Sequence, residues 1–427
     1  MPARKSIDEK ATLKLLKELV AIDSVNPSLV SGARGEQRAA KHVHKFLRTH
    51  GIAAKLEEAE RNRPNVVSTI PGGVKSRSGT ANARPALMIA AHIDTVGAGG
   101  MAEPFTPRVR DGKLYGRGAL DIKSGVAAMC AAAASVASDV GSGRLRLART
   151  FIIAAVVDEE CNSVGTESLL KHGHTADFGV VLEPTDLRRV IAHKGYAWFE
   201  IVTHGRAAHG SLPAEGRDAI RMMGRVLVAL DELEGRIAAR VKHPLLGSAS
   251  LHASLISGGQ ELSSYPAECR LQIERRLLPG ETEASAGAEL REMLAAIEKS
   301  GTRDTEGNAA FRATLRSGLG ARPAYEISED SLAVRRASAS IRRACGECEL
   351  AGMSAWTDTA LLAGNGIPGI VFGPSGCGLH GDSEYVEIES VHKCAAALRE
   401  IILEFCRSES SPSHVLNTRK LERALIF

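Results

Sequence analysis

The clearest hydrophobic pattern in the chain is a run of apolar residues at 86–91 that ends abruptly in polar chemistry. A short apolar run bounded by turn signals is typical of a strand that is buried on both faces. Two further runs, 151–157 and 179–182, have the same form. Because the carboxyl ends of parallel strands meet at one edge of an open sheet, we expect the polar residues at these strand ends to converge. These residues are His92, Asp94, Asp158, Glu159, Glu160 and Glu183.

Helical periodicity surrounds these strands, and the alternation favours an α/β fold with helices on both faces of a mostly parallel sheet. The Gly-rich turn at 116–118 leads into Asp121 and then into an alanine-rich segment that can pack closely. The polar segment 75–84 has the composition of a surface loop. The predicted helices cover 6–22, 35–47, 125–136, 331–345 and 390–406, and further strands are predicted at 53–56, 65–70 and 367–372.

The pattern changes between 194 and 325, where four predicted strands accompany two predicted helices. Their order along the chain is strand, helix, strand, strand, helix, strand, which resembles a ferredoxin-like α+β unit. A chain of 427 residues is also long for a single core. We therefore predict a discontinuous domain formed by 1–193 and 326–427, into which 194–325 is inserted. The elements predicted in the insert are 198–203, 217–233, 250–257, 267–278, 281–298 and 311–316.

Charge and composition exclude several classes of partner. The 54 basic and 50 acidic residues give a formal net charge of +4, too even a balance for a nucleic-acid-binding protein. No apolar segment follows the basic residues near position 1, so we expect no secretory signal, and no apolar run approaches the ~20 residues that span a bilayer. The eight cysteines are scattered, which predicts reduced core residues in a cytoplasmic protein. The lone Cys345–Cys348 pair is interpreted as part of a helix interior rather than as a zinc or redox site.

The predicted convergence of imidazoles and carboxylates points to a metal site. A set containing His92, Asp121, Glu159, Glu160, Glu183 and His380 offers imidazole and carboxylate ligands without thiolate, which suits Zn²⁺, Co²⁺ or Mn²⁺. One carboxylate bridging two ions would place them ~3.5–4 Å apart, as in two-metal hydrolases. Of the adjacent acids Glu159 and Glu160, one can bind metal while the other acts as a general base.

Each of these residues also has an ordinary structural interpretation. A histidine at a strand end is more often a structural residue. Asp158 to Glu160 has the composition of a solvated turn or a helix cap, and Asp121 could cap the helix that follows it. Their joint placement after predicted strands is what favours the metal site.

Several ordered motifs resemble those of the co-catalytic zinc amidohydrolases and exopeptidases, which include acetylornithine deacetylase, succinyl-diaminopimelate desuccinylase, aminoacylase and glutamate carboxypeptidase. The resemblance extends from about Leu13 to Cys406 and implies a zinc-exopeptidase-type α/β sandwich with an inserted lid and dimerisation domain. The motifs that carry it are Ala91 to Val96, Tyr115 to Lys123, Asp158 to Glu160, Leu182 to Thr185, Gly205 to Ser211, Arg276 to Gly280 and His380 to Tyr385.

The resemblance implies a role for each residue of the predicted site. Two zinc ions per subunit, replaceable by Co²⁺ or Mn²⁺, would be bridged by Asp121. His92 and Glu183 would complete one position, and His380 and Glu160 the other. Asp94 would hydrogen-bond the far nitrogen of His92, and Glu159 would be the general base. In that family the peptide after the bridging aspartate, here Asp121–Ile122, is typically cis.

The same resemblance implies residues that bind substrate in the inserted domain and nearby. His209 would stabilise the oxyanion in the active site of the other subunit of a homodimer, and Arg276 would pair with the α-carboxylate of the substrate. Their structural alternatives are a polar loop residue for His209 and a surface ion pair for Arg276. Ser263 stands where many relatives have a substrate-binding asparagine, which leaves the substrate open. Trp356 would line the pocket or belong to the core.

We therefore predict a zinc-dependent amidohydrolase that cleaves an N-acyl-amino acid or a small dipeptide. The alternatives within the family are a metallo-carboxypeptidase and a dipeptidase. The alternatives of another class are a catalytically silent relative that only binds a ligand, a serine hydrolase, for which no G-x-S-x-G motif exists, and a nucleic-acid-binding protein.

Overall fold

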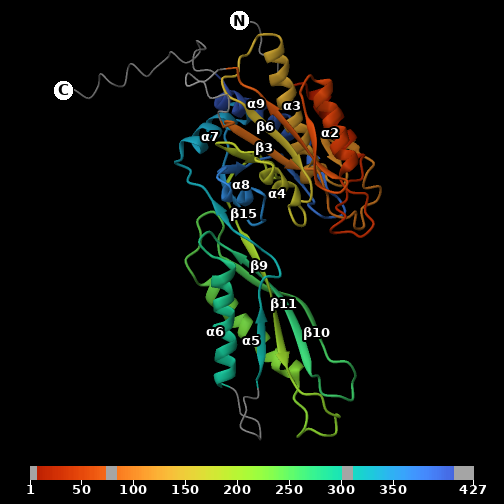
Figure 1. Ribbon diagram of the computed structural model, residues 1–427, viewed down its shortest axis with the longest axis vertical. Helices are drawn as coiled ribbons and strands as arrows, with labels where there is room; N and C mark the ends of the chain where they lie inside the picture. Colours follow the sequence, from red (N-terminus) through yellow and green to blue (C-terminus); the bar gives the residue numbers. More distant parts are fainter. Residues whose placement is uncertain (1–6, 74–83, 301–310, 408–427) are drawn as a thin grey trace, which may run out of the picture. The chain divides into compact units, whose positions relative to one another are not determined.

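The computed structural model describes residues 7–73, 84–300 and 311–407, and these form two compact units (Figure 1). Unit 1 comprises Met1–Arg189, Glu329–Glu349 and Gly364–Phe427, and unit 2 comprises Val190–Ser328 and Leu350–Ala363. The sequence predicted a single insert at 194–325, whereas the structure also assigns the later segment Leu350–Ala363 to unit 2. The predicted surface loop at 75–84 and the tail after 407 fall mostly outside the described residues.

The main sheet of unit 1 has the strand order β1-β2-β6-β3-β7-β16. Its centre is parallel, since β3 pairs with both β6 and β7, and β16 pairs with β7. At the β1 edge the strands run antiparallel, so the sheet is mixed rather than wholly parallel. Every residue of β3 and β6 is buried, as their apolar runs predict. The strands are β1 (Lys55–Glu60), β2 (Arg63–Ile70), β3 (Leu87–His92), β6 (Phe151–Val156), β7 (Gly179–Val181) and β16 (Gly369–Val371).

The helices of unit 1 pack on this sheet and on one another. Helices α3 and α9 pack against each other and against β3, while α7 packs against α9 and α1 packs against α3. Helix α1 begins after Asp8, whose side chain accepts a hydrogen bond from the Ala11 N–H and so caps the first turn. The helices are α1 (Glu9–Val20), α2 (Gln37–Thr49), α3 (Ser124–Gly141), α4 (Val164–Lys171), α7 (Leu332–Cys345) and α9 (Ile388–Cys406).

A small antiparallel sheet in unit 1 was not predicted from the sequence. Its order is β17-β18-β5-β4, and it pairs the segment after the predicted His380 motif with the segment before the Gly-rich turn. These strands have only two or three residues each, too few for alternation to be recognised. They are β4 (Arg108–Arg110), β5 (Lys113–Tyr115), β17 (Gly376–Cys377) and β18 (Tyr385–Glu387).

Among the described residues, one helical stretch, Ala119–Gly141, is long and apolar enough to cross a membrane. Its most apolar window is 89% buried inside the protein. The alanine-rich sequence of α3 therefore serves close packing against α1 and α9 in the core of unit 1.

Unit 2 contains the predicted ferredoxin-like arrangement. Its main sheet has the order β10-β11-β9-β12, with α5 and α6 packed against it around a core that includes Phe199, Leu271 and Leu290. Along β11 buried and less buried residues alternate, which is the pattern of a sheet covered on one face. The elements are β9 (Gly195–His204), α5 (Ala219–Ala238), β10 (Ser250–Gly258), β11 (Glu268–Leu277), α6 (Glu283–Ser300) and β12 (Ala313–Arg316).

Shorter elements complete unit 2. Strand β8 pairs with β14, and also with β15, which belongs to the late segment that returns to this unit. Strand β13 extends the main sheet by pairing with β9. These elements are β8 (Arg189–His193), β13 (Ala321–Arg322), β14 (Tyr325–Glu326), β15 (Leu350–Met353) and α8 (Thr359–Gly364).

The interpretation of Cys345 and Cys348 as a helix interior was wrong. Helix α7 ends at Cys345, and Gly346 follows with a φ of 86°, a conformation that glycine adopts without steric cost. The two thiols then point to different partners, Cys345 to the Lys393 carbonyl and Cys348 to the Leu187 carbonyl. All eight cysteines are free thiols.

Candidate metal centre

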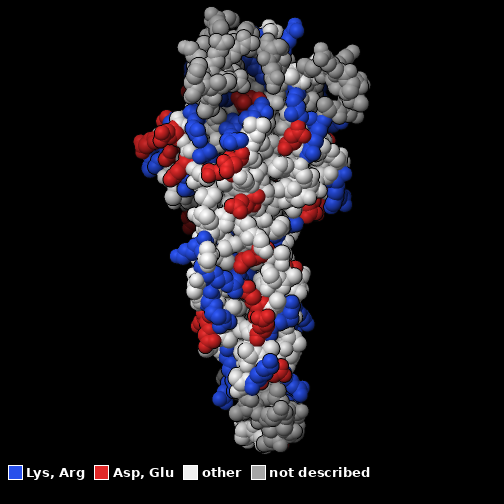
Figure 2. Space-filling view, turned by 90° about the vertical axis from the view of Figure 1, so that its left-hand side faces the viewer, with Lys and Arg blue, Asp and Glu red and all other residues white. Residues whose placement is uncertain are grey.

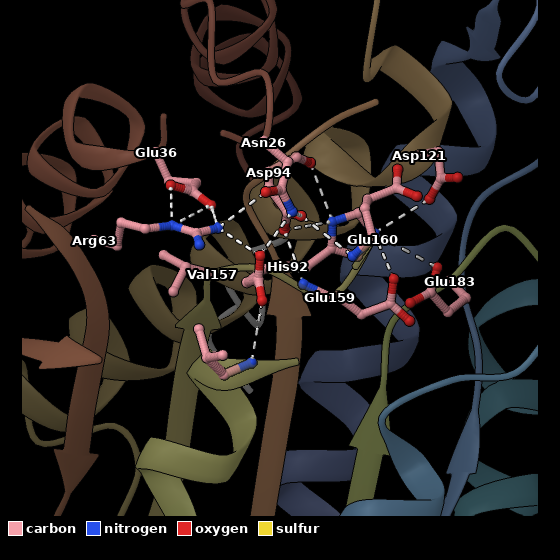
Figure 3. Close-up of polar contacts among 12 residues, drawn as sticks. Asn26, Glu36, Arg63, His92, Asp94, Asp121, Val157, Glu159, Glu160 and Glu183 are labelled. Carbon is pink, nitrogen blue, oxygen red and sulfur yellow. Dashed lines mark hydrogen bonds and ion pairs between the residues drawn. The ribbon is translucent and has the colours of Figure 1, made fainter. Parts of the chain in front are cut away.

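The strand ends of unit 1 bring the predicted polar residues together. His92 is the last residue of β3 and stands opposite Val156 at the end of the parallel strand β6. Glu159 and Glu160 follow β6, and Glu183 follows β7, the neighbour of β3 on its other side. Three adjacent strands therefore deliver their polar residues to the same edge of the sheet (Figure 3).

Asp121 lies between the two histidines. Its Oδ1 is 3.3 Å from His92 Nε2, and its Oδ2 is 3.3 Å from His380 Nε2. Each oxygen of one carboxylate thus faces a different imidazole, which is the arrangement that a bridging ligand requires.

The remaining acids divide between the two histidines. Glu160 Oε2 lies 3.2 Å from His380 Nε2, whereas Glu183 Oε2 lies 3.9 Å and Glu159 Oε2 4.0 Å from His92 Nε2. Two sets of three residues each offer ligand atoms that all lie within 4.8 Å of one another. One set is His92, Glu159 and Glu183, and the other is His92, Asp121 and Glu160. Nitrogen and carboxylate oxygen donors at this spacing fit borderline divalent cations.

Hydrogen bonding within the protein leaves the Glu160 carboxylate incompletely satisfied. Glu160 Oε1 is buried and has no hydrogen-bond partner among the described residues. A buried carboxylate oxygen without a donor is costly unless something else binds it. The residues present therefore fit a metal ion in this position.

Electrostatics also favour a cation between these groups. Burial raises the pKa of Glu160, and the hydrogen bond from His380 opposes that shift. Hydrogen bonds to Asp121 and Glu160 raise the pKa of His380 to about 10. The carboxylates thus draw a proton onto the imidazole, and a metal ion that binds here has to displace that proton.

The Gly-rich turn is held by a buried ion pair between Arg117 and Glu384, each about 1% exposed. Glu384 Oε2 accepts hydrogen bonds from Arg117 Nη1 at 2.8 Å and the Gly118 N–H at 2.9 Å. Its Oε1 accepts from the N–H groups of Leu120 at 2.8 Å and Asp121 at 3.0 Å. Arg117 also donates to the carbonyls of His380 and Gly381. One ion pair therefore orders the backbone of both Asp121 and His380.

Backbone geometry in this region is unusual at several positions. The Asp121–Ile122 peptide is cis, as the resemblance implied. Gly118 has a φ of 75°, and a Cβ there would lie 2.5 Å from Thr95 Cγ2, so no larger residue fits. Asp158 and His380 also have positive φ values, 67° and 58°, which are uncommon for residues other than glycine and cluster at functional sites.

Asp94 lies behind His92 and is completely buried. Its Oδ1 is 3.4 Å from His92 Nδ1, and its own carbonyl oxygen is 3.1 Å from the same nitrogen. The two carboxylate oxygens also accept hydrogen bonds from the N–H groups of Glu159 and Glu160, both at 3.2 Å. One carboxylate therefore contacts both the imidazole of His92 and the loop that carries the adjacent acids.

The other residues of the predicted site belong to unit 2 and form two groups there. His209 and Ser263 are neighbours, because the Gly210 N–H donates to the Ser263 carbonyl and His209 pairs with Ser264 in an isolated bridge. Both side chains are exposed, and His209 Nδ1 lies 2.7 Å from Ser211 Oγ.

Arg276 and Trp356 form the second group, around Tyr196. The Arg276 guanidinium carbon lies 5.7 Å from the centre of the Tyr196 ring, and the rings of Tyr196 and Trp356 meet edge to face at 6.2 Å. Arg276 Nε donates to Glu274 Oε1 at 2.6 Å. The ring of Trp198, the other tryptophan of the chain, has its centre 5.1 Å from that of the Tyr196 ring.

Sequence reasoning did not single out five polar residues that order this centre. Arg117 and Glu384 lie inside motifs that were recognised, so their positions carried a signal although their pairing did not. Three others lie in segments predicted only as a helix, for Glu36, or as connections, for Asn26 and Arg63, and nothing in their surroundings distinguishes them from exposed polar residues.

Side chains of both charges share one face of the described part of the protein. Figure 2 shows Lys and Arg interspersed with Asp and Glu on the visible face of the described residues, without a continuous basic surface. Phosphate backbones are bound by clustered basic side chains.

A comparison with protein families matches residues 88–404, more than half of the chain, to the model for peptidase family M20/M25/M40. The chain belongs to that family. The match contains all five predicted metal ligands together with Glu159. The resemblance inferred from the motifs is thereby confirmed, and the chain is a metal-dependent hydrolase of amide bonds.

Individual relatives match nearly the whole chain. It is 27% identical over 410 residues to acetylornithine deacetylase of Myxococcus xanthus, covering 92% of this chain and 96% of the relative. It is 25% identical over 428 residues to N-formyl-4-amino-5-aminomethyl-2-methylpyrimidine deformylase of Bacillus subtilis (strain 168), covering 94% and 97%. Among solved structures, a dinuclear metal-binding peptidase of the M20 family from Bacillus subtilis has a TM-score of 0.66 at 16% identity, covering 93% and 99%, which shows the shared fold.

Proposed function

We propose that this protein is a zinc-dependent deacylase that hydrolyses the amide bond of N-acyl-L-amino acids. The observation that carries the proposal is the position of Asp121, whose two oxygens each lie 3.3 Å from a different histidine, with Glu159 beside them. The four sequence relatives that match more than nine tenths of the chain are two acetylornithine deacetylases and two formyl-pyrimidine deformylases, which favours deacylation over the carboxypeptidase and dipeptidase alternatives.

The distances between the side chains support the ligand assignment. His380, Glu160 and one oxygen of Asp121 would hold one ion, and His92, Glu183 and the other oxygen would hold the second. Bound zinc supplies a Lewis acid and lowers the pKa of water towards neutrality. Co²⁺ or Mn²⁺ accepts the same donors and would substitute.

The chain itself supplies the proton transfer. Glu159 Oε2 lies 4.0 Å from His92 Nε2, next to the ligand atoms, and its side chain is partly exposed. It takes the proton of the attacking water and then delivers it to the nitrogen of the departing amine. Asp94 holds the His92 ring so that Nε2 faces the ligand cluster.

Substrate recognition is assigned to side chains of unit 2. Arg276 contacts Glu274 through Nε, so the two terminal nitrogens of its guanidinium offer further donors to a carboxylate. Trp356 and Tyr196 provide an aromatic wall beside it. His209 would stabilise the developing oxyanion in the active site of the other subunit of a homodimer, and Ser263, its neighbour, would bind substrate there.

The exposed edge of unit 2 supports a homodimer. Strand β10 is the edge strand of its sheet, and its residues after Leu251 are exposed, among them Leu255 at 66% and Ile256 at 57%. An edge strand with exposed apolar side chains is a template for pairing with a second strand. We also place the protein in the cytoplasm, where its free thiols stay reduced.

The test is hydrolysis by metal-depleted and reconstituted protein. N-acetyl, N-formyl and N-succinyl amino acids and a set of dipeptides are supplied, and the released amine is measured. Activity should vanish after chelation and return with Zn²⁺ or Co²⁺. Glu159→Gln should retain the metal but lower kcat by about 10² to 10⁴.

Three results would contradict the proposal. Cleavage of dipeptides without cleavage of N-acyl amino acids would favour the peptidase alternative. Ligand binding without turnover of any amide would favour the catalytically silent alternative. Full activity after chelation would exclude the metal mechanism.

A further inference from the structure

A group of buried polar side chains lies behind the metal centre, on the side of Asp94 away from the ligand atoms (Figure 3). Asn26, Glu36, Asp94 and Asp158 are 0% exposed, and Arg63 is 6% exposed. Three carboxylates share this volume with one guanidinium. Burying charges is costly unless each is paired and hydrogen-bonded, so the contacts within this group determine what it can do.

Arg63 is the centre of the group. Its Nε and Nη2 donate to the Glu36 carboxylate, and its Nη2 also donates to Asp158 Oδ1 at 2.7 Å and to Asn26 Oδ1 at 3.1 Å. Its Nη1 donates to Ser28 Oγ at 2.9 Å. Burial alone would lower the pKa of Arg63, but Glu36 and Asp158 raise it, so the guanidinium stays charged.

Asn26 links Arg63 to Asp94 by hydrogen bonds. Its Oδ1 accepts from Arg63, so its Nδ2 faces the acids and donates to Asp94 Oδ2 at 2.8 Å and Asp158 Oδ1 at 3.0 Å. The guanidinium can only donate, so it fixes which way the amide points. Asp94 in turn accepts the N–H groups of Glu159 and Glu160.

Asp158 gives a second connection from Arg63 to the same loop. It precedes Glu159 directly, and its Oδ2 accepts the Asn162 N–H at 3.2 Å. Arg63 is therefore connected to this loop in two ways. It bonds Asp158 at the start of the loop directly, and it is linked to Glu159 and Glu160 through Asn26 and Asp94. Neither Arg63 nor Asn26 contacts a predicted ligand.

We propose that Arg63 and Asn26 are positioning residues of the metal centre, which set the direction of the Asp94 carboxylate and thereby the placement of His92, Glu159 and Glu160. This inference rests on the proposed function, because it assigns these residues to the metal site named there. If the two residues only stabilised the fold, their replacement would lower stability without a specific effect on the metal. The positioning role predicts in addition that metal affinity and turnover depend on the Arg63 guanidinium and on the Asn26 amide.

Arg63→Lys tests the guanidinium, and Arg399→Lys is its matched control. Arg399 is also 6% exposed in unit 1 and pairs with the buried Asp139 at 2.6 Å, but it has no contact with the metal centre. Lysine keeps the charge and removes the fork of donors. Each variant is depleted of metal and titrated with Co²⁺, whose visible spectrum reports the ligand geometry, and unfolding in urea is measured alongside.

Arg63→Lys should weaken Co²⁺ binding by about 10- to 100-fold, alter the Co²⁺ spectrum and lower kcat with little change in KM. Arg399→Lys should lose stability but keep the affinity and spectrum of the wild type. Equal Co²⁺ affinity in both variants would overturn the inference. A wild type that binds no Co²⁺ would overturn the proposed function and this inference with it, so the two failures are distinguishable.

Asn26→Ala is a second variant in case lysine at position 63 prevents folding. Its control is Asn65→Ala, because Asn65 is equally buried and bonds only backbone groups, the Gly165 carbonyl and the Val157 N–H. Weaker Co²⁺ binding in Asn26→Ala than in Asn65→Ala supports the inference, and equal binding by the two overturns it.

Discussion

Replacing Glu384 by glutamine should destabilise the protein strongly although the change in shape is small. The two oxygens of Glu384 accept four hydrogen bonds, from Arg117 and from the N–H groups of Gly118, Leu120 and Asp121. Glutamine retains one oxygen and puts an NH₂ group in place of the other. Two of the four donors then face another donor.

The magnitude follows from which donors are lost. The more favourable orientation keeps the oxygen at Arg117, so the buried N–H groups of Leu120 and Asp121 lose their acceptor. At about 1–3 kcal/mol for each unsatisfied buried donor, the free energy of unfolding should fall by about 2–6 kcal/mol. The weaker charge opposite Arg117 adds to the loss, since breaking a buried ion pair costs about 3–5 kcal/mol.

Urea unfolding of wild type and Glu384→Gln measures this loss. Glu389→Gln is the control, because Glu389 pairs with Lys393 on the exposed face of α9 and its removal should change stability little. If Glu384→Gln cost less than about 1 kcal/mol, the assignment of Glu384 as acceptor of these backbone groups would be refuted.

Three further predictions concern unit 2. His193 is fully buried, and burial lowers its pKa from 6.5 to about 4. The unfolded chain therefore takes up a proton at a pH where the folded protein does not, so the free energy of unfolding should fall by up to about 3 kcal/mol from pH 6.5 to 4. His193→Gln should flatten this dependence in urea titrations, and an unchanged slope would contradict the assignment. Both tryptophans lie beside Tyr196 near Arg276, so an N-acetyl amino acid should alter the fluorescence of metal-depleted protein, whereas its α-amide should not. A similar response to both compounds would count against a carboxylate site at Arg276. Leu255→Lys on the edge strand should convert a dimer into a monomer in light scattering, and an unchanged mass would exclude this edge as the interface.

The sequence predicted the parts of the fold that local patterns specify. The fully apolar strands β3 and β6 and the polar residues that follow them lie where expected, because burial on both faces leaves no alternative pattern. The order of the predicted elements of unit 2 was likewise readable, since strands β9 to β12 are 4 to 10 residues long and helices α5 and α6 have 20 and 18 residues.

The features that the sequence did not reveal depend on contacts between distant segments. Arg63 and Glu36 are buried polar residues that form an ion pair with each other, and the sequence around neither position differs from that of a surface residue. Strand β18 pairs with β5, which is far away in the chain, and β17 pairs only with β18 in turn. The return of Leu350–Ala363 to unit 2 depends in the same way on the pairing of β15 with β8.

The location of Asn26 and Arg63 has a consequence for how this protein can be shortened. Both residues precede position 88, where the match to the family begins. A fragment starting there would retain every predicted ligand, yet Asp94 and Asp158 would lose the amide and the guanidinium that now donate to them. Trimming the gene to its recognisable portion should therefore yield a polypeptide with a complete set of ligand residues but little capacity to retain metal.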